Sequence, residues 1–344
     1  MSNVWRAYAG SVPASEDPVS EDLVVEGAAL ARLGWDRALA AAAAADLAHH
    51  GASPGRVARV DRGWATVMTA SGTVRAQLAG HSVATGDWLL VERGKVVAAL
   101  PRRSAFVRGD AGEGRSRRPQ VVAANVDLVF VVQSLSNGPN IRRLERELVL
   151  AFESGAVPVV VLSKADLVDP ADVERAVEAA RAAAAGVEVV VTSAVTGAGL
   201  DRLRSLAHAD RTVALIGASG VGKSRLVNGL VGDSVQAIGA VRENDQRGRH
   251  TTTARELVAL PGGGWLVDTP GLRSVAMWDA DEGLSRVFSD IEGLVARCRF
   301  KNCSHGPEPD CAVRAAIERG ELDAARFEHY QRLDHELDEN ARER

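Results

Sequence analysis

The sequence lacks most of the features that mark secreted and membrane proteins. Its 344 residues include only three cysteines, all between Cys298 and Cys311, so a disulfide framework is excluded. The N-terminus has no basic start followed by an apolar core, which excludes a secretory signal. The longest apolar run, Ala38–Ala45, is too short to span a bilayer. We therefore expect a protein of the reducing cytoplasm that does not bind membranes.

Aromatic residues are also scarce, at 4% of the chain, and the net charge is only −4. Bulk attraction to nucleic acid is not expected from such a charge. The distribution is uneven, however, because residues 51–120 hold twelve Arg and Lys against five Asp and Glu. This local excess of positive charge predicts a contact with phosphates in one part of the chain. The length suggests two or three domains.

The N-terminal third changes character at residue 51. Residues 1–50 are an acidic, irregular start followed by an Ala-rich helix over Trp35–His50, and Gly51, Pro54 and Gly55 end it. Residues 51–103 then hold five short β-type runs punctuated by glycines, which predicts a small β-barrel. It is either an oligonucleotide-binding (OB) barrel or a generic small barrel with a solvated basic face. The expected strands are Arg56–Val60, Trp64–Thr69, Gly72–Leu78, Asp87–Glu92 and Lys95–Leu100.

The next segment, Arg102–Gln120, carries six arginines among glycines, which predicts a flexible basic arm or a charged linker. Beyond it, apolar strands alternate with helices, as in a mostly parallel sheet covered on both faces. We assign residues 104–280 to this α/β domain, including the arm, and residues 281–344 to a helical domain. The expected strands are Val126–Gln133, Val157–Leu162, Val187–Thr192, Thr212–Ile216, Arg255–Leu260 and Gly264–Val267, and the expected helices are Arg142–Ser154, Ala171–Ala185 and Leu200–Ala207.

A phosphate-binding loop is the most specific motif of the chain. Residues 217–224 read G-x-x-x-x-G-K-S, after an apolar strand and before a helix, which is the setting that this motif requires. Glycines allow backbone N–H groups to surround a phosphate, the lysine reaches the terminal phosphates, and the serine hydroxyl binds Mg²⁺. The predicted nucleotide ligands here are Gly217, Ala218, Ser219, Gly220, Val221, Gly222, Lys223, Ser224 and Arg225.

Two further segments complete a nucleoside triphosphate site. Asp268-Thr269-Pro270-Gly271 is a D-x-x-G motif at the end of an apolar strand, in which the Asp holds Mg²⁺ and the Gly senses a γ-phosphate. Gly248–Thr253 lies where the first switch of a GTPase belongs, and we assign the Mg²⁺-binding hydroxyl among its three threonines to Thr252. Leu272 occupies the place of the water-orienting Gln, so His250 is the candidate catalytic residue.

The base-reading segments favour guanine. Ser163-Lys164-Ala165-Asp166 is similar to the N/T-K-x-D motif of GTPases, in which the Asp accepts hydrogen bonds from two guanine donors that adenine lacks. Ser163 stands where Asn is usual, which weakens one bond by about 0.5–1.5 kcal/mol. Ser193 and Ala194, after the next strand, are similar to the motif that closes over the base. All of these segments precede the phosphate loop, whereas they follow it in Ras-like proteins, so the order indicates a circularly permuted GTPase domain.

The cysteines form the last motif. Cys298, Cys303, His305 and Cys311 offer three thiolates and an imidazole within fourteen residues, a ligand set that suits one tetrahedral, structural Zn²⁺.

Together these motifs resemble the RsgA (YjeQ/EngC) family of circularly permuted, ribosome-dependent GTPases. The resemblance covers about residues 51–330 and rests on Leu100–Arg108, Gln120–Asp127 and the motifs above. It implies an OB barrel, a permuted GTPase domain and a zinc domain that bind the small ribosomal subunit and its rRNA late in assembly. It also implies ribosome-stimulated GTP hydrolysis and a catalytic role for His250, and we expect a monomer. Two functions from other classes stay open: a P-loop kinase or ATPase acting on a small molecule, and a non-catalytic, nucleotide-gated RNA-binding module.

Overall fold

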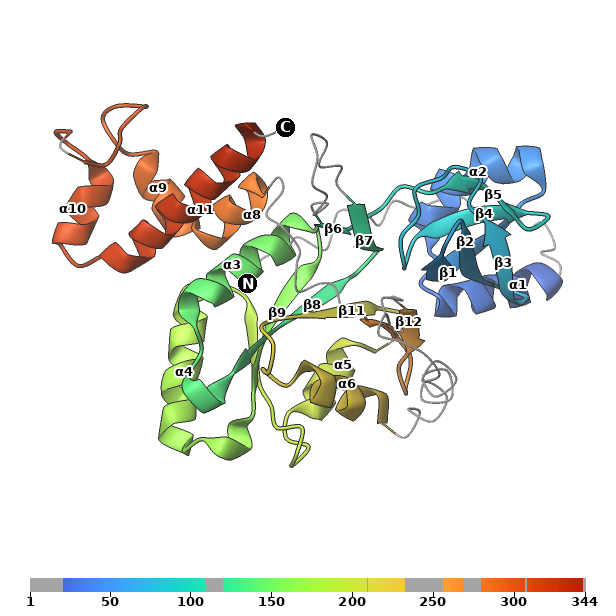
Figure 1. The fold of residues 1–344 in the computed structure, drawn as a ribbon, viewed down its shortest axis with the longest axis horizontal. Coiled ribbons are helices and arrows are strands. Elements are labelled where there is room, and N and C mark those ends of the chain that lie inside the picture. Colours follow the sequence, from blue (N-terminus) through green and yellow to red (C-terminus); the bar gives the residue numbers. More distant parts are fainter. Residues whose placement is uncertain are drawn as a thin grey trace, which may run out of the picture.

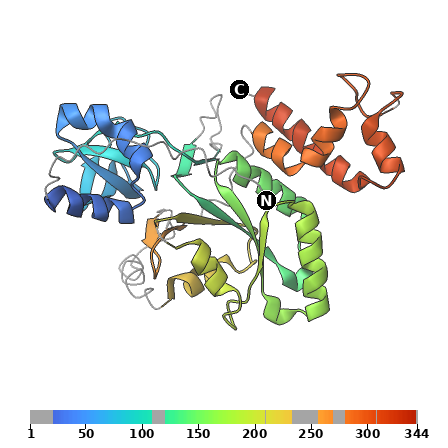
Figure 2. The ribbon, with the colours of Figure 1, turned by 180° about the vertical axis from the view of Figure 1, so that it is seen from behind.

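The fold has three lobes in a row. A computed structural model describes residues 21–108, 120–208, 210–232, 256–268, 280–306 and 308–342. A β-barrel with two helices forms one end, an α/β domain lies in the middle, and a helical lobe forms the other end (Figures 1 and 2). The middle lobe contacts both of the other lobes.

The five strands of the first lobe close into a barrel. Their order is β1-β2-β3-β5-β4, and β1 also pairs with β4, which joins the two ends. Only β3 and β5 pair in parallel, through a single residue pair, Gln77↔Lys95. This closed order is that of the OB barrel, so the prediction of a small five-stranded barrel is confirmed. The strands are β1 (Ser53–Asp61), β2 (Trp64–Thr69), β3 (Gly72–Gln77), β4 (Trp88–Glu92) and β5 (Lys95–Ala99).

Two helices cover the barrel, and the sequence predicted only the second. Helix α2 (Arg37–His50) begins at Asp36, whose side chain accepts hydrogen bonds from two backbone N–H groups of its first turn. Helix α1 (Glu21–Arg32) occupies a stretch that we expected to be irregular, so that prediction is wrong. The Trp35 ring, between the helices, meets the buried Trp88 ring edge-on at 4.9 Å. Packing on the barrel, rather than local helix propensity, explains why α1 forms.

The middle lobe contains a six-stranded sheet in the order β10-β9-β8-β11-β13-β12. All neighbours are parallel except β12, which runs antiparallel to β13. At its outer edge β12 pairs with β1 of the barrel through Arg59↔Glu256, so one continuous sheet joins the two lobes. The strands are β8 (Leu128–Ser134), β9 (Val157–Ser163), β10 (Glu188–Val191), β11 (Thr212–Ile216), β12 (Glu256–Ala259) and β13 (Trp265–Asp268).

Helices cover both faces of this sheet, as its uninterrupted apolar strands predict. Helices α3 (Ile141–Glu153) and α4 (Pro170–Ala183) share one core with alternate residues of β8, such as Val129 and Val131. Helices α5 (Leu200–Leu206) and α6 (Lys223–Val231) share the opposite core with Phe130 and Val132. The carboxyl ends of the parallel strands are thus held at one edge.

The junction between barrel and sheet is more ordered than predicted. Ala105–Arg108 (β6) and Gln120–Ala124 (β7) form a two-stranded antiparallel sheet, so the predicted flexible arm is wrong at both ends, and residues 109–119 lie outside the described residues. Arg56 of the barrel is buried here and donates hydrogen bonds to three segments. Its guanidinium reaches the Leu33 carbonyl at 2.6 Å, the Asn125 carbonyl at 3.1 Å and the Thr212 hydroxyl at 2.5 Å. One side chain therefore ties the N-terminal helices, the barrel and β11 together.

The third lobe is helical, as predicted for residues 281–344. Its longest helix, α11, lies against α3 and α8 and buries Phe327, Tyr330, Leu333 and Leu337. The helices are α8 (Asp281–Val287), α9 (Ser289–Val295), α10 (Ala312–Glu318) and α11 (Ala324–Arg342).

Candidate functional site

A cavity of about 550 Å³ opens at the carboxyl ends of β9, β10 and β11. Its walls come from three segments that are far apart in the sequence: the end of β9, the loop after β10, and the loop and helix after β11. The lining residues are Ser163, Lys164, Asp166, Leu167, Ala194, Val195, Gly220, Gly222, Lys223, Ser224, Arg225 and Leu226. The predicted base-reading and phosphate-reading motifs therefore share one cavity.

The phosphate loop enters the cavity between β11 and α6. Gly217 has φ +142°, and a Cβ there would lie 2.4 Å from the carbonyl oxygen of Val132, so only glycine fits. The Lys223 ammonium donates to the carbonyl oxygens of Gly217 at 2.7 Å and Ala218 at 2.6 Å. The lysine is thus folded back over its own loop, where incoming phosphates would meet it.

On the base side of the cavity, Asp166 is held by a serine. The Ser193 hydroxyl donates to one oxygen of the Asp166 carboxylate at 2.5 Å and accepts from the backbone N–H groups of Val195 and Thr196. This arrangement fixes the direction of the carboxylate. Lys164, beside it, has a left-handed backbone with φ +61° that turns the chain at the cavity wall.

Ser163 links the two halves of the site. Its side chain is 2% exposed, and its hydroxyl lies 2.6 Å from the Val221 carbonyl of the phosphate loop and 3.1 Å from the Gln133 carbonyl of β8. The hydroxyl is thus directed at the loop backbone. The serine at this position of the base-reading motif therefore contacts the phosphate loop directly.

The structure describes only part of the predicted switch segments. His250, Thr251, Thr252, Thr253 and Gly271 lie outside the described residues. Asp268 ends β13, which runs parallel to β11 with Ala214 opposite Val267, so its backbone lies at the edge from which the phosphate loop starts.

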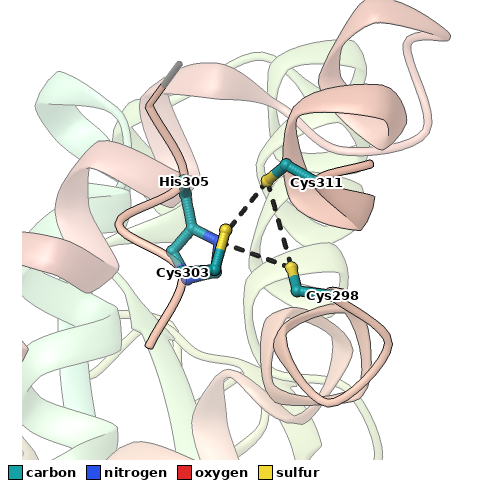
Figure 3. A group of neighbouring side chains, drawn as sticks. All are labelled: Cys298, Cys303, His305 and Cys311. Carbon is teal, nitrogen blue, oxygen red and sulfur yellow. Dashed lines mark hydrogen bonds between the residues drawn. The ribbon is translucent and has the colours of Figure 1, made fainter. Parts of the chain in front are cut away.

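The predicted metal ligands converge in the helical lobe (Figure 3). The ligand atoms of Cys298, Cys303, His305 and Cys311 all lie within 4.8 Å of one another. His305 Nδ1 is 3.6 Å from the Cys298 sulfur and 3.5 Å from the Cys311 sulfur, and the two sulfurs are 3.9 Å apart. Four ligands placed about 2.3 Å from a tetrahedral metal are about 3.8 Å apart, so this cluster could hold one metal ion.

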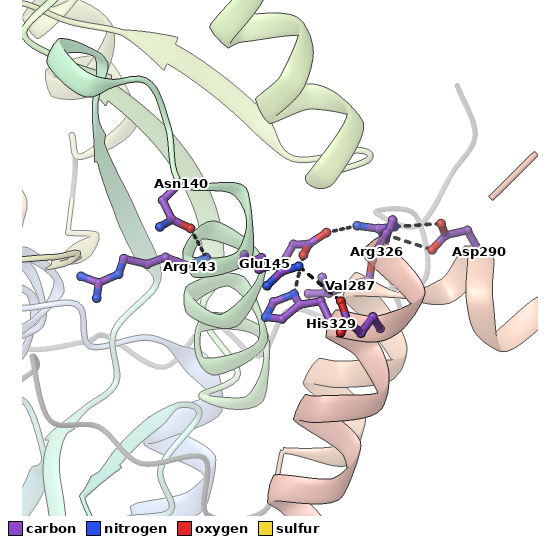
Figure 4. A network of polar contacts seen from close by, with 9 residues as sticks. Asn140, Arg143, Glu145, Val287, Asp290, Arg326 and His329 are labelled. Atoms are coloured by element: carbon purple, nitrogen blue, oxygen red, sulfur yellow. Dashed lines mark hydrogen bonds and ion pairs between the residues drawn. The ribbon is translucent and has the colours of Figure 1, made fainter. Parts of the chain in front are cut away.

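Ion pairs, one of them buried, join helix α3 of the middle lobe to the helical lobe (Figure 4). Glu145 of α3 is 2% exposed and accepts from Arg326 and, at 2.6 Å, from His329 of α11. Arg326 also pairs with Asp290 of α9 at 3.0 Å. The next residue of α3, Arg146, makes a two-bond contact with Glu336, which lies about two turns beyond His329 on α11. Removing one partner of a buried ion pair costs about 3–5 kcal/mol, so these contacts fix the lobe on α3.

Sequence reasoning missed several residues at the nucleotide cavity. Leu167 and Val195 line the cavity with side chains that are 64% and 68% exposed, which suits contact with an aromatic base. Each comes directly after a base-reading motif, so its position in the sequence could have indicated a place at the cavity. Gln133 and Glu147 lie behind the phosphate loop, and no motif marks either of them.

Comparison with known proteins decides the family. A sequence model of the RsgA GTPase family matches residues 99–278, more than half of the chain. The chain belongs to the RsgA GTPase family. The match covers the residues that line the cavity, and it includes His250–Thr253 and Gly271.

Relatives of the RsgA family cover nearly the whole chain. A protein of Streptomyces coelicolor named small ribosomal subunit biogenesis GTPase RsgA is 47% identical over 317 residues, which is 89% of this chain and 86% of that protein. The crystal structure of YjeQ from Thermotoga maritima is 27% identical, has a TM-score of 0.63 and covers 83% of this chain and 98% of its own. YloQ, described as a circularly permuted GTPase, is 25% identical with a TM-score of 0.61 and covers 85% and 96%.

These RsgA relatives confirm the predicted architecture: a barrel, a circularly permuted GTPase domain and a helical C-terminal part with a Cys/His cluster. The chain is a GTPase. Among the described helices, none is both long enough and apolar enough to cross a bilayer.

Proposed function

We propose that this GTPase assists the assembly of the small ribosomal subunit, and that the subunit accelerates its GTP hydrolysis. The observation that carries the proposal is the shared cavity, in which the loop holding Asp166 faces the phosphate loop across the permuted sheet. The Streptomyces relative is named a small ribosomal subunit biogenesis GTPase, which supports the small subunit as the partner. We infer a cytoplasmic monomer that binds GTP and GDP.

In this proposal Asp166 reads guanine, while Lys164, Ala165, Ser193 and Ala194 enclose the base. The phosphates lie on Gly217–Arg225, and Gly271 contacts the γ-phosphate. Ser224, Thr252 and Asp268 would hold Mg²⁺, which supplies charge neutralisation at the β- and γ-phosphates. Ser224 fits this role because it lines the cavity beside Lys223. His250 is the proposed catalytic residue.

The Cys298–Cys311 cluster would bind one structural Zn²⁺ in this proposal. Three thiolates and an imidazole leave no open position, so the metal would stabilise the loop and take no part in hydrolysis. Basic side chains lie on this loop: Arg297, Arg299 and Lys301 are exposed, and the Arg299 guanidinium lies 5.5 Å from the Phe300 ring. We therefore assign rRNA contacts to this lobe as well as to the barrel.

GTP hydrolysis by the purified protein should rise at least about tenfold when small ribosomal subunits are added. His250→Ala should lose most of this increase while still binding GDP, because the residue acts on the attacking water. Single-turnover phosphate release, with and without subunits, measures both effects. Equal rates with and without subunits would contradict the assembly role. Stimulated turnover in His250→Ala would show that His250 is not the catalytic residue.

The barrel offers a specific RNA contact. The Trp64 side chain is 41% exposed, and the Arg75 guanidinium stacks over it at 5.5 Å from the ring centroid. Trp64→Ala should weaken binding to small-subunit rRNA by about 1–3 kcal/mol, because one stacked base loses its platform. Arg75→Gln should lower the salt dependence of binding by about one phosphate contact. Binding titrations at several salt concentrations measure both, with the neighbouring, exposed Val74→Ala as the control. Unchanged binding in both variants would place the RNA contact elsewhere.

A further inference from the structure

The end of β8 forms the floor of the phosphate loop. β8 and β11 are paired in parallel, with Val131 opposite Ile216. The loop starts so close to β8 that a Cβ at Gly217 would meet the Val132 carbonyl at 2.4 Å. Whatever occupies the next position of β8 therefore lies directly behind the phosphate site.

That next residue, Gln133, joins the loop to helix α3. Its side chain is 3% exposed and donates from Nε2 to a carboxylate oxygen of Glu147 at 2.7 Å. Its backbone carbonyl accepts from Ser163, whose hydroxyl also reaches the phosphate loop at Val221. Three polar contacts, from Glu147 to Gln133, from Gln133 to Ser163 and from Ser163 to Val221, thus link Glu147 to the loop, although it belongs to a different element.

The carboxyl group of Glu147 titrates at a higher pH than an ordinary glutamate. Burial raises the pKa of Glu147 to about 7, against the hydrogen bond from Gln133 and the positive charges of Arg143 and Lys223, which lower it. Of these charges, Arg143 lies one turn away on α3 and Lys223 is the phosphate-loop lysine.

Charged groups at both ends of α3 are engaged elsewhere, because Arg142 pairs with Glu328 of α11 and Glu153 accepts from the backbone N–H of Gly283. Glu145 and Arg146 contact α11, and Arg286 of α8 lies over the Phe152 ring. Helix α4 faces the core with alanines, whereas its acidic and basic side chains lie mainly on its exposed side. Lys223 is therefore the charge through which a bound nucleotide would act on Glu147.

We propose that Glu147 is a positioning residue that balances the charge of Lys223 in the empty site and takes up a proton when nucleotide phosphates fill the loop. The proposal rests on the proposed nucleotide site. Phosphates bring several negative charges to Lys223, so the positive field that keeps Glu147 ionised is neutralised in the complex. The neutral carboxyl group then keeps its bond to Gln133 without repelling the nucleotide. The proton comes from solvent, and no covalent bond changes.

The sign of the pH dependence follows from this linkage. Because the complex holds the proton more tightly than the free protein, binding takes up a proton above about pH 7, where the free carboxyl group is ionised. Affinity for GDP should therefore fall as the pH rises from 7 to 8.5, at most tenfold per pH unit for one proton. Below about pH 6 the free protein is already protonated, and the dependence from this group should vanish.

Calorimetric titration of the full-length protein with GDP, in two buffers of different ionisation enthalpy, measures the protons taken up directly. At pH 8 the terminal phosphate of GDP, which titrates near about pH 6, is already ionised and adds little. We expect net proton uptake at pH 8 in the natural protein, and uptake near zero in Glu147→Gln. Equal uptake in the two proteins would overturn the proposal.

Two surface variants complete the test. Arg143→Gln removes a positive charge that lowers the pKa of Glu147, so the pH dependence should move to higher pH. Glu174→Gln, an exposed acid of α4, should behave as the natural protein. Absence of any GDP binding would contradict the proposed nucleotide site, whereas tight binding without proton uptake would contradict the role of Glu147 alone.

Discussion

Replacement of Asp166 by alanine is expected to lower the affinity for GDP and GTP by about 100- to 10,000-fold. The carboxylate would accept two hydrogen bonds from guanine, and each bond to a charged acceptor contributes about 1.5–3 kcal/mol. The cavity wall itself should survive, because Asp166 lies in a short 3-10 helix, Ala165–Leu167, that directly follows the buried strand β9. Titration with fluorescent guanine and adenine nucleotides measures the change and shows whether the preference for guanine is lost.

Graded controls separate base recognition from folding. Ser193→Ala should cost about tenfold, since it frees the carboxylate from the 2.5 Å bond that directs it without removing the acceptor. Asp172→Ala, on the exposed first turn of α4, should leave affinity unchanged. If ATP displaced GDP as well as GTP does from the natural protein, the guanine assignment of Asp166 would be wrong.

Loss of the metal is expected to unfold the loop over residues 298–311 while leaving the nucleotide cavity intact. Zinc binding contributes about 10–16 kcal/mol in small zinc-finger peptides, and here the ligand-bearing loop has little apolar core of its own. The cavity shares no residue with the cluster. Helices α8 and α11 should stay on α3, because Glu145 and the buried leucines of the lobe hold them there.

Hydrogen exchange with and without a chelator, together with metal analysis, measures this effect. Cys311→Ser should reduce the zinc content from about one per chain to near zero and speed exchange over the loop, whereas Asn302→Ala, an exposed neighbour, should do neither. Unchanged exchange over 298–311 after complete removal of the metal would show that the loop folds without it.

The parts of the fold that the sequence predicted are those with local causes. The strand Thr212–Ile216 is predicted to the residue, because its apolar run ends at a glycine that only the phosphate loop explains. The barrel strands follow from glycine punctuation, and the metal cluster follows from the spacing of its cysteines.

The missed parts depend on partners distant in sequence. Helix α1 is stabilised by Leu30, and by Leu33 just after the helix, which share a core with the barrel, and β6 is a strand only because β7 pairs with it. The position of Ser163 against the phosphate loop is set by a residue 58 positions later. Glu147 reads as an ordinary surface acid of a helix, since only the fold shows that Gln133 meets it.

The strand order has a consequence for synthesis and stability. Strands β8, β9 and β10 are made first and form one side of the central sheet, and β11, β12 and β13 are made later and form the other. Asp166 belongs to the early half and Lys223 to the late half, so a nascent chain ending before β11 has no phosphate loop. A nucleotide in the cavity would bridge the two halves. Since a ligand at 100 times its Kd adds about 2.7 kcal/mol to the stability of the folded state, GDP would also protect the completed sheet from opening along the β8–β11 boundary.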